Sequence, residues 1–134
     1  MKKPNIVFLI QDQMQQQVLR EESGCIMPNL WQMMEDSVEF ERAYSCNAVC
    51  SPARASLMTG VLPHIHGMVD CTHTVPQYRA DYDDTLDTFT RVLSEEGYHV
   101  SYYGKWHIER THELEKFGIE DYITERNIPG MNVT

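Results

Sequence analysis

The sequence lacks any apolar run long enough to cross a membrane. Its longest stretch, from Ile6 to Ile10, has five residues, whereas a spanning helix needs about 20. Lys2 and Lys3 precede this run, but it is also too short for the apolar region of a signal peptide, and polar residues follow at once. We therefore expect neither a leader nor a membrane segment here, which indicates a cytoplasmic protein or a secreted one whose leader is absent from this chain.

Basic residues are scarce. Eleven Lys and Arg stand against 20 Asp and Glu, which gives a formal net charge of −9. Because binding to a phosphate backbone needs a basic surface, nucleic acid is excluded as a partner. The charge also disfavours a polyanionic polymer, although a local basic pocket could override it. With 134 residues, 42% of them hydrophobic, the chain is about one domain long and can bury a core.

Paired cysteine motifs are also missing. The four cysteines, Cys25, Cys46, Cys50 and Cys71, show no Cys-x-x-Cys spacing, so the sequence indicates neither a zinc site nor a disulfide framework. A disulfide between Cys46 and Cys50 would require a tightly folded intervening loop and is the minor interpretation.

The apolar pattern predicts alternating strands and helices. Residues 5–10 are continuously apolar after Asn5, as in a parallel strand that is covered on both faces. Residues 28–38 predict a helix, 40–44 a short strand, 84–97 a helix with Asp84 as N-cap, and 98–103 a strand. This order favours an α/β fold in which a mostly parallel sheet is flanked by helices.

A short helix is expected just after Cys50. Ser51 suits the N-cap, Pro52 the first helical position, and Gly60 the residue past the end. The helix N-terminus favours a thiolate or a bound anion beside Cys50, and Arg54 lies one turn further along the same side. The alternative is a buried structural cysteine with a solvated arginine.

Polar side chains follow two of the predicted strands. Asp12 comes after the first, and Lys105 and His107 come after the strand at 98–103. Open α/β sheets bind ligands at such strand ends. In an extended segment, Lys105 and His107 would point to the same side, which suits a tetrahedral anion and a proton transfer. Asp12 alone is as compatible with a turn residue as with a metal ligand.

Two motifs resemble the type I sulfatases, which belong to the alkaline phosphatase-like superfamily. They are Cys50-x-Pro52-x-Arg54 followed by Leu57-Met58-Thr59-Gly60, and Gly104-Lys105-Trp106-His107. Ala53 stands where serine is commoner in the family. The resemblance covers essentially the whole chain, but only the N-terminal part of the family. It therefore implies that residues 1–134 are an incomplete sulfatase catalytic domain with an alkaline phosphatase-like fold.

The resemblance implies a formylglycine nucleophile. Cys50 would be oxidised by a formylglycine-generating enzyme or an anaerobic sulfatase-maturing enzyme, and its hydrated aldehyde would then attack the sulfur of a sulfate ester. By the same resemblance, Arg54 stabilises the ionised diol, Lys105 clamps a sulfate oxygen, and His107 is the base that helps to release sulfate. The substrate would be a sulfated small molecule or glycan.

The resemblance also implies a calcium or magnesium ion. Its ligands in this chain would be Asp12, residue 50 in its formylglycine form, and Gln11, which stands where many members have an Asp. A single Asp is found in relatives that resemble choline sulfatases and phosphonate monoester hydrolases. The family's second pair of metal ligands has no counterpart here, so these 134 residues alone are expected to be inactive. The alternatives are a phosphonate or phosphate ester hydrolase of the same superfamily and a non-catalytic fragment.

Overall fold

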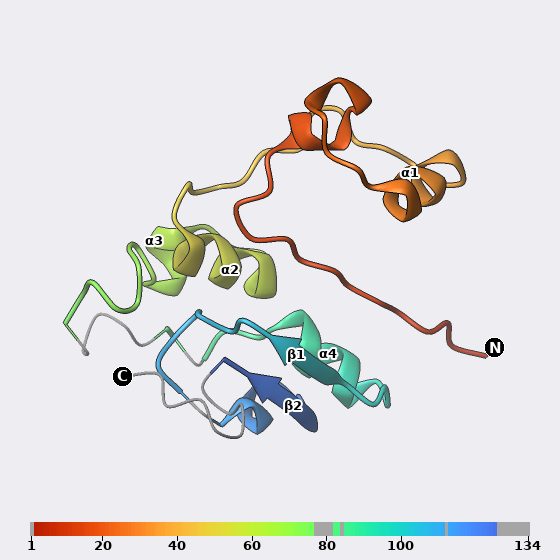
Figure 1. Cartoon of the computed structure of the whole chain (residues 1–134). Helices are drawn as coiled ribbons and strands as arrows, with labels where there is room; N and C mark the ends of the chain where they lie inside the picture. Colours follow the sequence, from red (N-terminus) through yellow and green to blue (C-terminus); the bar gives the residue numbers. More distant parts are fainter. Residues whose placement is uncertain (1, 77–81, 84, 112, 126–134) are drawn as a thin grey trace. The chain divides into compact units, whose positions relative to one another are not determined.

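The computed structural model describes residues 2–76, 82–83, 85–111 and 113–125. The chain forms two compact units, Met1–Ala43 and Tyr44–Thr134. The position of one unit relative to the other is not defined, so each is described by itself (Figure 1). No helix within the described ranges is long and apolar enough to span a membrane.

The first unit holds three short helical segments. Two are 3-10 helices, η1 at Gln16–Leu19 and η2 at Glu21–Ser23, and the third is the α-helix α1 at Pro28–Glu35. Pro28 occupies the first turn of α1, as predicted, although the helix ends three residues before the expected Val38. The Trp31 indole nitrogen Nε1 donates a hydrogen bond of 2.9 Å to the carbonyl of Leu19, which joins α1 to η1.

Two predicted strands are wrong. Residues 5–10 form no regular strand, and the apolar side chains of residues 6–9 are between 55% and 81% exposed. Residues 40–44 also lack strand structure, with Phe40 and Tyr44 exposed. The physical reason is that a strand with two apolar faces needs neighbouring strands and covering helices, and the sheet in the described part of the chain is formed by β1 and β2 and includes neither segment.

In its described residues, the second unit combines four helical segments with a small parallel sheet. The helices are α2 at Cys50–Thr59, α3 at Pro63–His66, α4 at Phe89–Glu95 and the 3-10 helix η4 at Leu114–Phe117. Strand β1 at Ser101–Gly104 pairs in parallel with β2 at Asp121–Thr124, so that Ser101 lies opposite Asp121 (Figure 1). Within the described residues the sheet has these two strands, fewer than the predicted fold requires.

Helix α4 begins later than predicted. Its N-cap is Thr88, whose hydroxyl accepts a hydrogen bond of 3.2 Å from the backbone N–H of Arg91. The expected N-cap, Asp84, lies outside the described residues. Strand β1 likewise begins at Ser101 rather than at Tyr98, because residues 97–98 still complete the helix end: the Tyr98 N–H donates to the carbonyl of Leu93.

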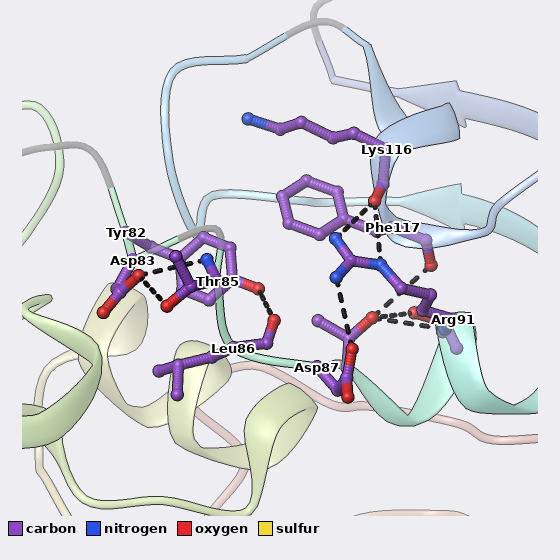
Figure 2. Close-up of polar contacts among 10 residues, drawn as sticks. Tyr82, Asp83, Thr85, Leu86, Asp87, Arg91, Lys116 and Phe117 are labelled. Carbon is purple, nitrogen blue, oxygen red and sulfur yellow. Dashed lines mark hydrogen bonds and ion pairs between the residues drawn. The ribbon is translucent and has the colours of Figure 1, made fainter.

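The core of the second unit lies against the segment that follows β1. Trp106 is 2% exposed and its ring centroid lies 4.9 Å from that of Phe117 and 5.3 Å from that of Tyr102. Next to Phe117 in the chain, the carbonyl of Lys116 accepts a hydrogen bond from Arg91 of α4, as Figure 2 shows. Because Trp106 stands between Lys105 and His107, its burial fixes the backbone that carries both site candidates.

Candidate active site

Helix α2 places Cys50 in its first turn. The N-cap is Val49 with extended backbone angles, so the helix begins two residues earlier than the prediction that made Ser51 the cap. Ser51 is instead fully buried, and its hydroxyl accepts a hydrogen bond of 3.1 Å from the N–H of Thr72. The far end is as predicted: Gly60 adopts a left-handed conformation with φ of 74°.

The structure brings Cys50 and His107 together across 57 residues of sequence. The Sγ atom of Cys50 lies 3.2 Å from Nδ1 of His107, and the Ser51 hydroxyl lies 3.4 Å from the same nitrogen. Both Cys50 and His107 are half-buried, so solvent can reach the pair. A sulfur and an imidazole nitrogen at this distance can exchange a proton directly.

His107 reaches Cys50 through a turn rather than through an extended strand. Its φ of 47° is left-handed, and Gly104 at the end of β1 also has a positive φ of 115°. The expectation that Lys105 and His107 belong to one extended segment is therefore wrong. Burial, and then the positive charge of Lys105, lower the pKa of His107. His107 is thus neutral near pH 7 and keeps a lone pair for a proton.

Arg54 ties helix α2 to the end of β1. Its guanidinium donates a hydrogen bond of 2.6 Å to the carbonyl of Lys105 and one of 3.4 Å to the hydroxyl of Tyr102. Tyr102 donates its own hydroxyl proton to the same Lys105 carbonyl at 2.5 Å. Because Arg54 is only 7% exposed, these charge-assisted contacts are shielded from water and hold the Lys105 backbone in place.

Two further residues join the cluster, and sequence reasoning gave neither of them a role. Cys71 is buried, and its Sγ lies 3.8 Å from Sγ of Cys50. His73 is exposed, and its Nδ1 lies 3.3 Å from the Cys71 sulfur and 3.0 Å from Nε2 of His107. Burial raises the pKa of the Cys71 thiol. The spacing Cys71-x-His73 was the available signal, but it becomes informative only when the fold adds Cys50 and His107.

Gln11 and Asp12 lie in the first unit, and their distance from Cys50 is not defined. Both side chains are exposed, and their amide and carboxylate oxygens are donors that suit calcium or magnesium. The donors gathered around Cys50 are different, being thiols and imidazoles. A hard cation would therefore depend on the oxygens of Gln11 and Asp12.

A thiol beside a neutral imidazole at a helix start, with Lys105 and Arg54 nearby, brings together a possible nucleophile, a base and positive charge. The comparison with protein families makes this specific. A family model described as "Sulfatase" matches residues 4–131. The chain belongs to the sulfatase family.

Individual relatives agree with this assignment. An N-acetylglucosamine-6-O-sulfatase from Bacteroides thetaiotaomicron is 29% identical over 109 residues, which are 80% of this chain and 18% of that protein. A choline-sulfatase from Rhizobium meliloti is 29% identical over 124 residues, covering 91% of this chain and 22% of the relative. The crystal structure of Ps i-CgsB matches with a TM-score of 0.64 and 28% identity, over 72% of this chain and 22% of that one. The chain thus spans about a fifth of the length of these relatives.

Proposed function

We propose that this chain carries the nucleophile-bearing part of a sulfuric ester hydrolase. Residues 1–134 would be the N-terminal portion of an alkaline phosphatase-like catalytic domain whose remaining strands and ligands lie outside this sequence. The observation that carries the proposal is the contact of 3.2 Å between Cys50 and His107, because it joins the two sulfatase-like motifs at their chemically active residues. Proximity of this kind is what a nucleophile and its base require.

Residue 50 would act in its formylglycine form. The hydrated aldehyde supplies one oxygen that attacks sulfur and a second whose proton can be removed to restore the aldehyde. His107 would take that proton, a role supported by the 3.2 Å distance between its Nδ1 and the Cys50 sulfur and by its lowered pKa, which leaves it neutral. Its depressed basicity also lets it return the proton to a leaving group or to water.

The two cations have separate tasks in this proposal. Lys105 is half-buried and its charge reaches His107, so its ammonium group would hold a sulfate oxygen beside the base. Arg54 donates to the Lys105 carbonyl and would thereby position the Lys105 backbone, while its positive charge would stabilise negative charge that develops at residue 50.

Gln11 and Asp12 would hold the calcium or magnesium ion. When bound, such a cation supplies positive charge that neutralises sulfate oxygens. The test of this assignment is the Asp12→Asn exchange in the full-length protein, which removes a charge and keeps the shape of the side chain. It should weaken calcium binding, whereas Asp36→Asn, at an exposed position just after α1, should not.

The substrate class is proposed from the relatives. One is named for the 6-O-sulfate of N-acetylglucosamine, and Ps i-CgsB has been crystallised with k-i-k-neocarrahexaose. A sulfated glycan is therefore our first candidate and a small sulfate ester such as that of the choline-sulfatase relative is the second. In either case conversion of Cys50 requires a maturation enzyme as a partner.

The decisive experiment compares matched esters in the full-length protein. We expect hydrolysis of an aryl sulfate to exceed that of the matching aryl phosphonate, and Cys50→Ala to abolish it. Cys46→Ala is the control, since Cys46 is exposed and free. Faster cleavage of the phosphonate would establish the alternative hydrolase of the same superfamily. Substantial activity in Cys50→Ala would remove the basis of the mechanism, and no activity in the wild type would favour a non-catalytic chain.

A further inference from the structure

We propose that, before conversion to formylglycine, the second unit binds one zinc ion through Cys50, Cys71 and His107. The three residues come from helix α2, from the loop after α3 and from the turn after β1. They offer one ligand atom each, and these atoms all lie within 4.8 Å of one another. The zinc site does not depend on sulfatase activity, because it uses the thiol form of residue 50.

The distances fit a tetrahedral zinc ion. Zn–S bonds of about 2.3 Å and Zn–N bonds of about 2.0–2.1 Å imply a sulfur–sulfur edge of about 3.8 Å and a sulfur–nitrogen edge of about 3.6 Å. The Cys50 and Cys71 sulfurs are 3.8 Å apart. The imidazole of His107 lies 3.2 Å from the first sulfur through Nδ1 and 3.9 Å from the second through Nε2. One of these two ring nitrogens would bind the ion, and because the three ligand atoms already lie within 4.8 Å of one another, we expect rotation of the side chains to close the site on a metal.

The donor set selects a soft or borderline cation. Two thiolates and one imidazole are the ligands of zinc, while calcium and magnesium prefer oxygen. Binding would replace two thiol protons by one Zn²⁺ ion and release both protons to solvent, which leaves the three-ligand centre neutral. A neutral centre is favourable here because Cys71 is buried and Cys50 is half-buried, and a net charge would be costly to bury.

Neighbouring groups already orient these ligands. The Ser51 hydroxyl points its proton at the Cys71 sulfur across 3.9 Å, while it accepts a hydrogen bond from the Thr72 N–H. Such outer contacts hold a metal-binding thiolate in place. His73 is exposed and lies 3.3 Å from the Cys71 sulfur, and water would complete the coordination of the ion.

If residue 50 is converted as proposed above, zinc and formylglycine are mutually exclusive. The maturation enzyme consumes the sulfur that zinc needs, so only chains that escaped conversion would carry the ion. Zinc would then cap the Cys50 thiol of an unconverted chain and protect it from oxidation. This consequence rests on the proposed function, whereas the zinc site itself does not.

The test uses the full chain produced without a maturation enzyme, with the Cys50 thiol verified by mass spectrometry. Metal content is measured after equilibration with zinc under reducing conditions, and Co²⁺ is used as a spectroscopic probe, because thiolate coordination gives a charge-transfer band. The variants are Cys71→Ser and His107→Gln. The matched control is Cys46→Ser, which changes an exposed cysteine outside the cluster. Circular dichroism establishes that each variant is folded.

We expect one zinc ion per chain and a cobalt–thiolate band in the wild type and in Cys46→Ser. Zinc affinity should fall at least about tenfold in Cys71→Ser and His107→Gln. Absence of zinc from the wild type, equal affinity in Cys71→Ser, or a Cys50–Cys71 disulfide formed in preference to metal binding would overturn the proposal. None of these measurements involves a substrate or a converted residue 50, so failure here leaves the sulfatase proposal standing, and loss of sulfatase activity leaves the zinc site standing.

Discussion

Replacing Gly118 by alanine should destabilise the second unit by about 2–4 kcal/mol. Gly118 follows η4 with a φ of 73°, and a Cβ atom there would lie 2.7 Å from Cα of Arg91 and 3.0 Å from Cβ of Ser94. Figure 2 shows the neighbouring contact, in which the Arg91 side chain reaches the Lys116 carbonyl. The obstructing Arg91 atom is helix backbone, so it cannot move aside without shifting α4.

Three contributions make up this cost, and a control variant separates the overpacking from the other two. Left-handed strain costs an alanine about 1–2 kcal/mol, and reduced freedom of the unfolded chain returns about 0.4–1 kcal/mol. Overpacking against α4 adds about 1–3 kcal/mol. Gly60 has nearly the same φ, 74°, but a Cβ atom added there would meet nothing within 4 Å. Gly60→Ala should therefore cost only about 1 kcal/mol.

Urea unfolding followed by tryptophan fluorescence measures both variants. The chain has two tryptophans, and a Trp31→Phe background leaves Trp106, which is 2% exposed in the core of the second unit, as the single reporter. The difference between the two free energies of unfolding should be about 1–3 kcal/mol. Equal losses would refute the close approach of η4 to α4 and the core arrangement built on it.

Three other perturbations have defined outcomes. Tyr102→Phe removes the hydrogen bond to the Lys105 carbonyl and should cost about 0.5–1.5 kcal/mol in urea unfolding, with a lower kcat in the full-length protein; an unchanged kcat would show that this bond does not position Lys105. Burial lowers the pKa of His66, so the contribution of neutral His66 to the free energy of unfolding is complete above about pH 6.5 and is lost as the pH falls. In His66→Gln the free energy of unfolding should therefore fall less steeply at acid pH. Hydrogen bonds to Asp121 and Glu120 raise the pKa of His99, so its contribution is complete below about pH 6.5 and disappears as the pH rises through the folded-state pKa; an NMR titration of His99 with an unshifted midpoint would contradict this.

Local sequence signals predicted the local features of the fold. Pro28 marked the start of α1, and Gly60 marked the end of α2. Each of these features depends on backbone preferences within a few residues. The start of α4 was less predictable, because several residues before it can cap a helix and Thr88 does so.

Features that depend on distant partners could not be predicted in the same way. Residues 5–10 have the composition of a buried strand, but a strand forms only where neighbours pair with it. The same distinction between local signals and distant partners applies to the site residues. Motif resemblance singled out Cys50 and His107, which the fold brings together, while Cys71 and His73 were missed because their proximity arises from chain folding across 34 residues or more from His107.

The central claim is that residue 50 acts as a formylglycine nucleophile beside His107. Tandem mass spectrometry of the peptide that contains residue 50 tests it most directly, on full-length protein isolated from its native host and shown to hydrolyse an aryl sulfate. We expect an aldehyde at position 50, in a proportion that follows the specific activity of each preparation. Full activity in a preparation whose residue 50 is entirely unmodified cysteine would contradict it.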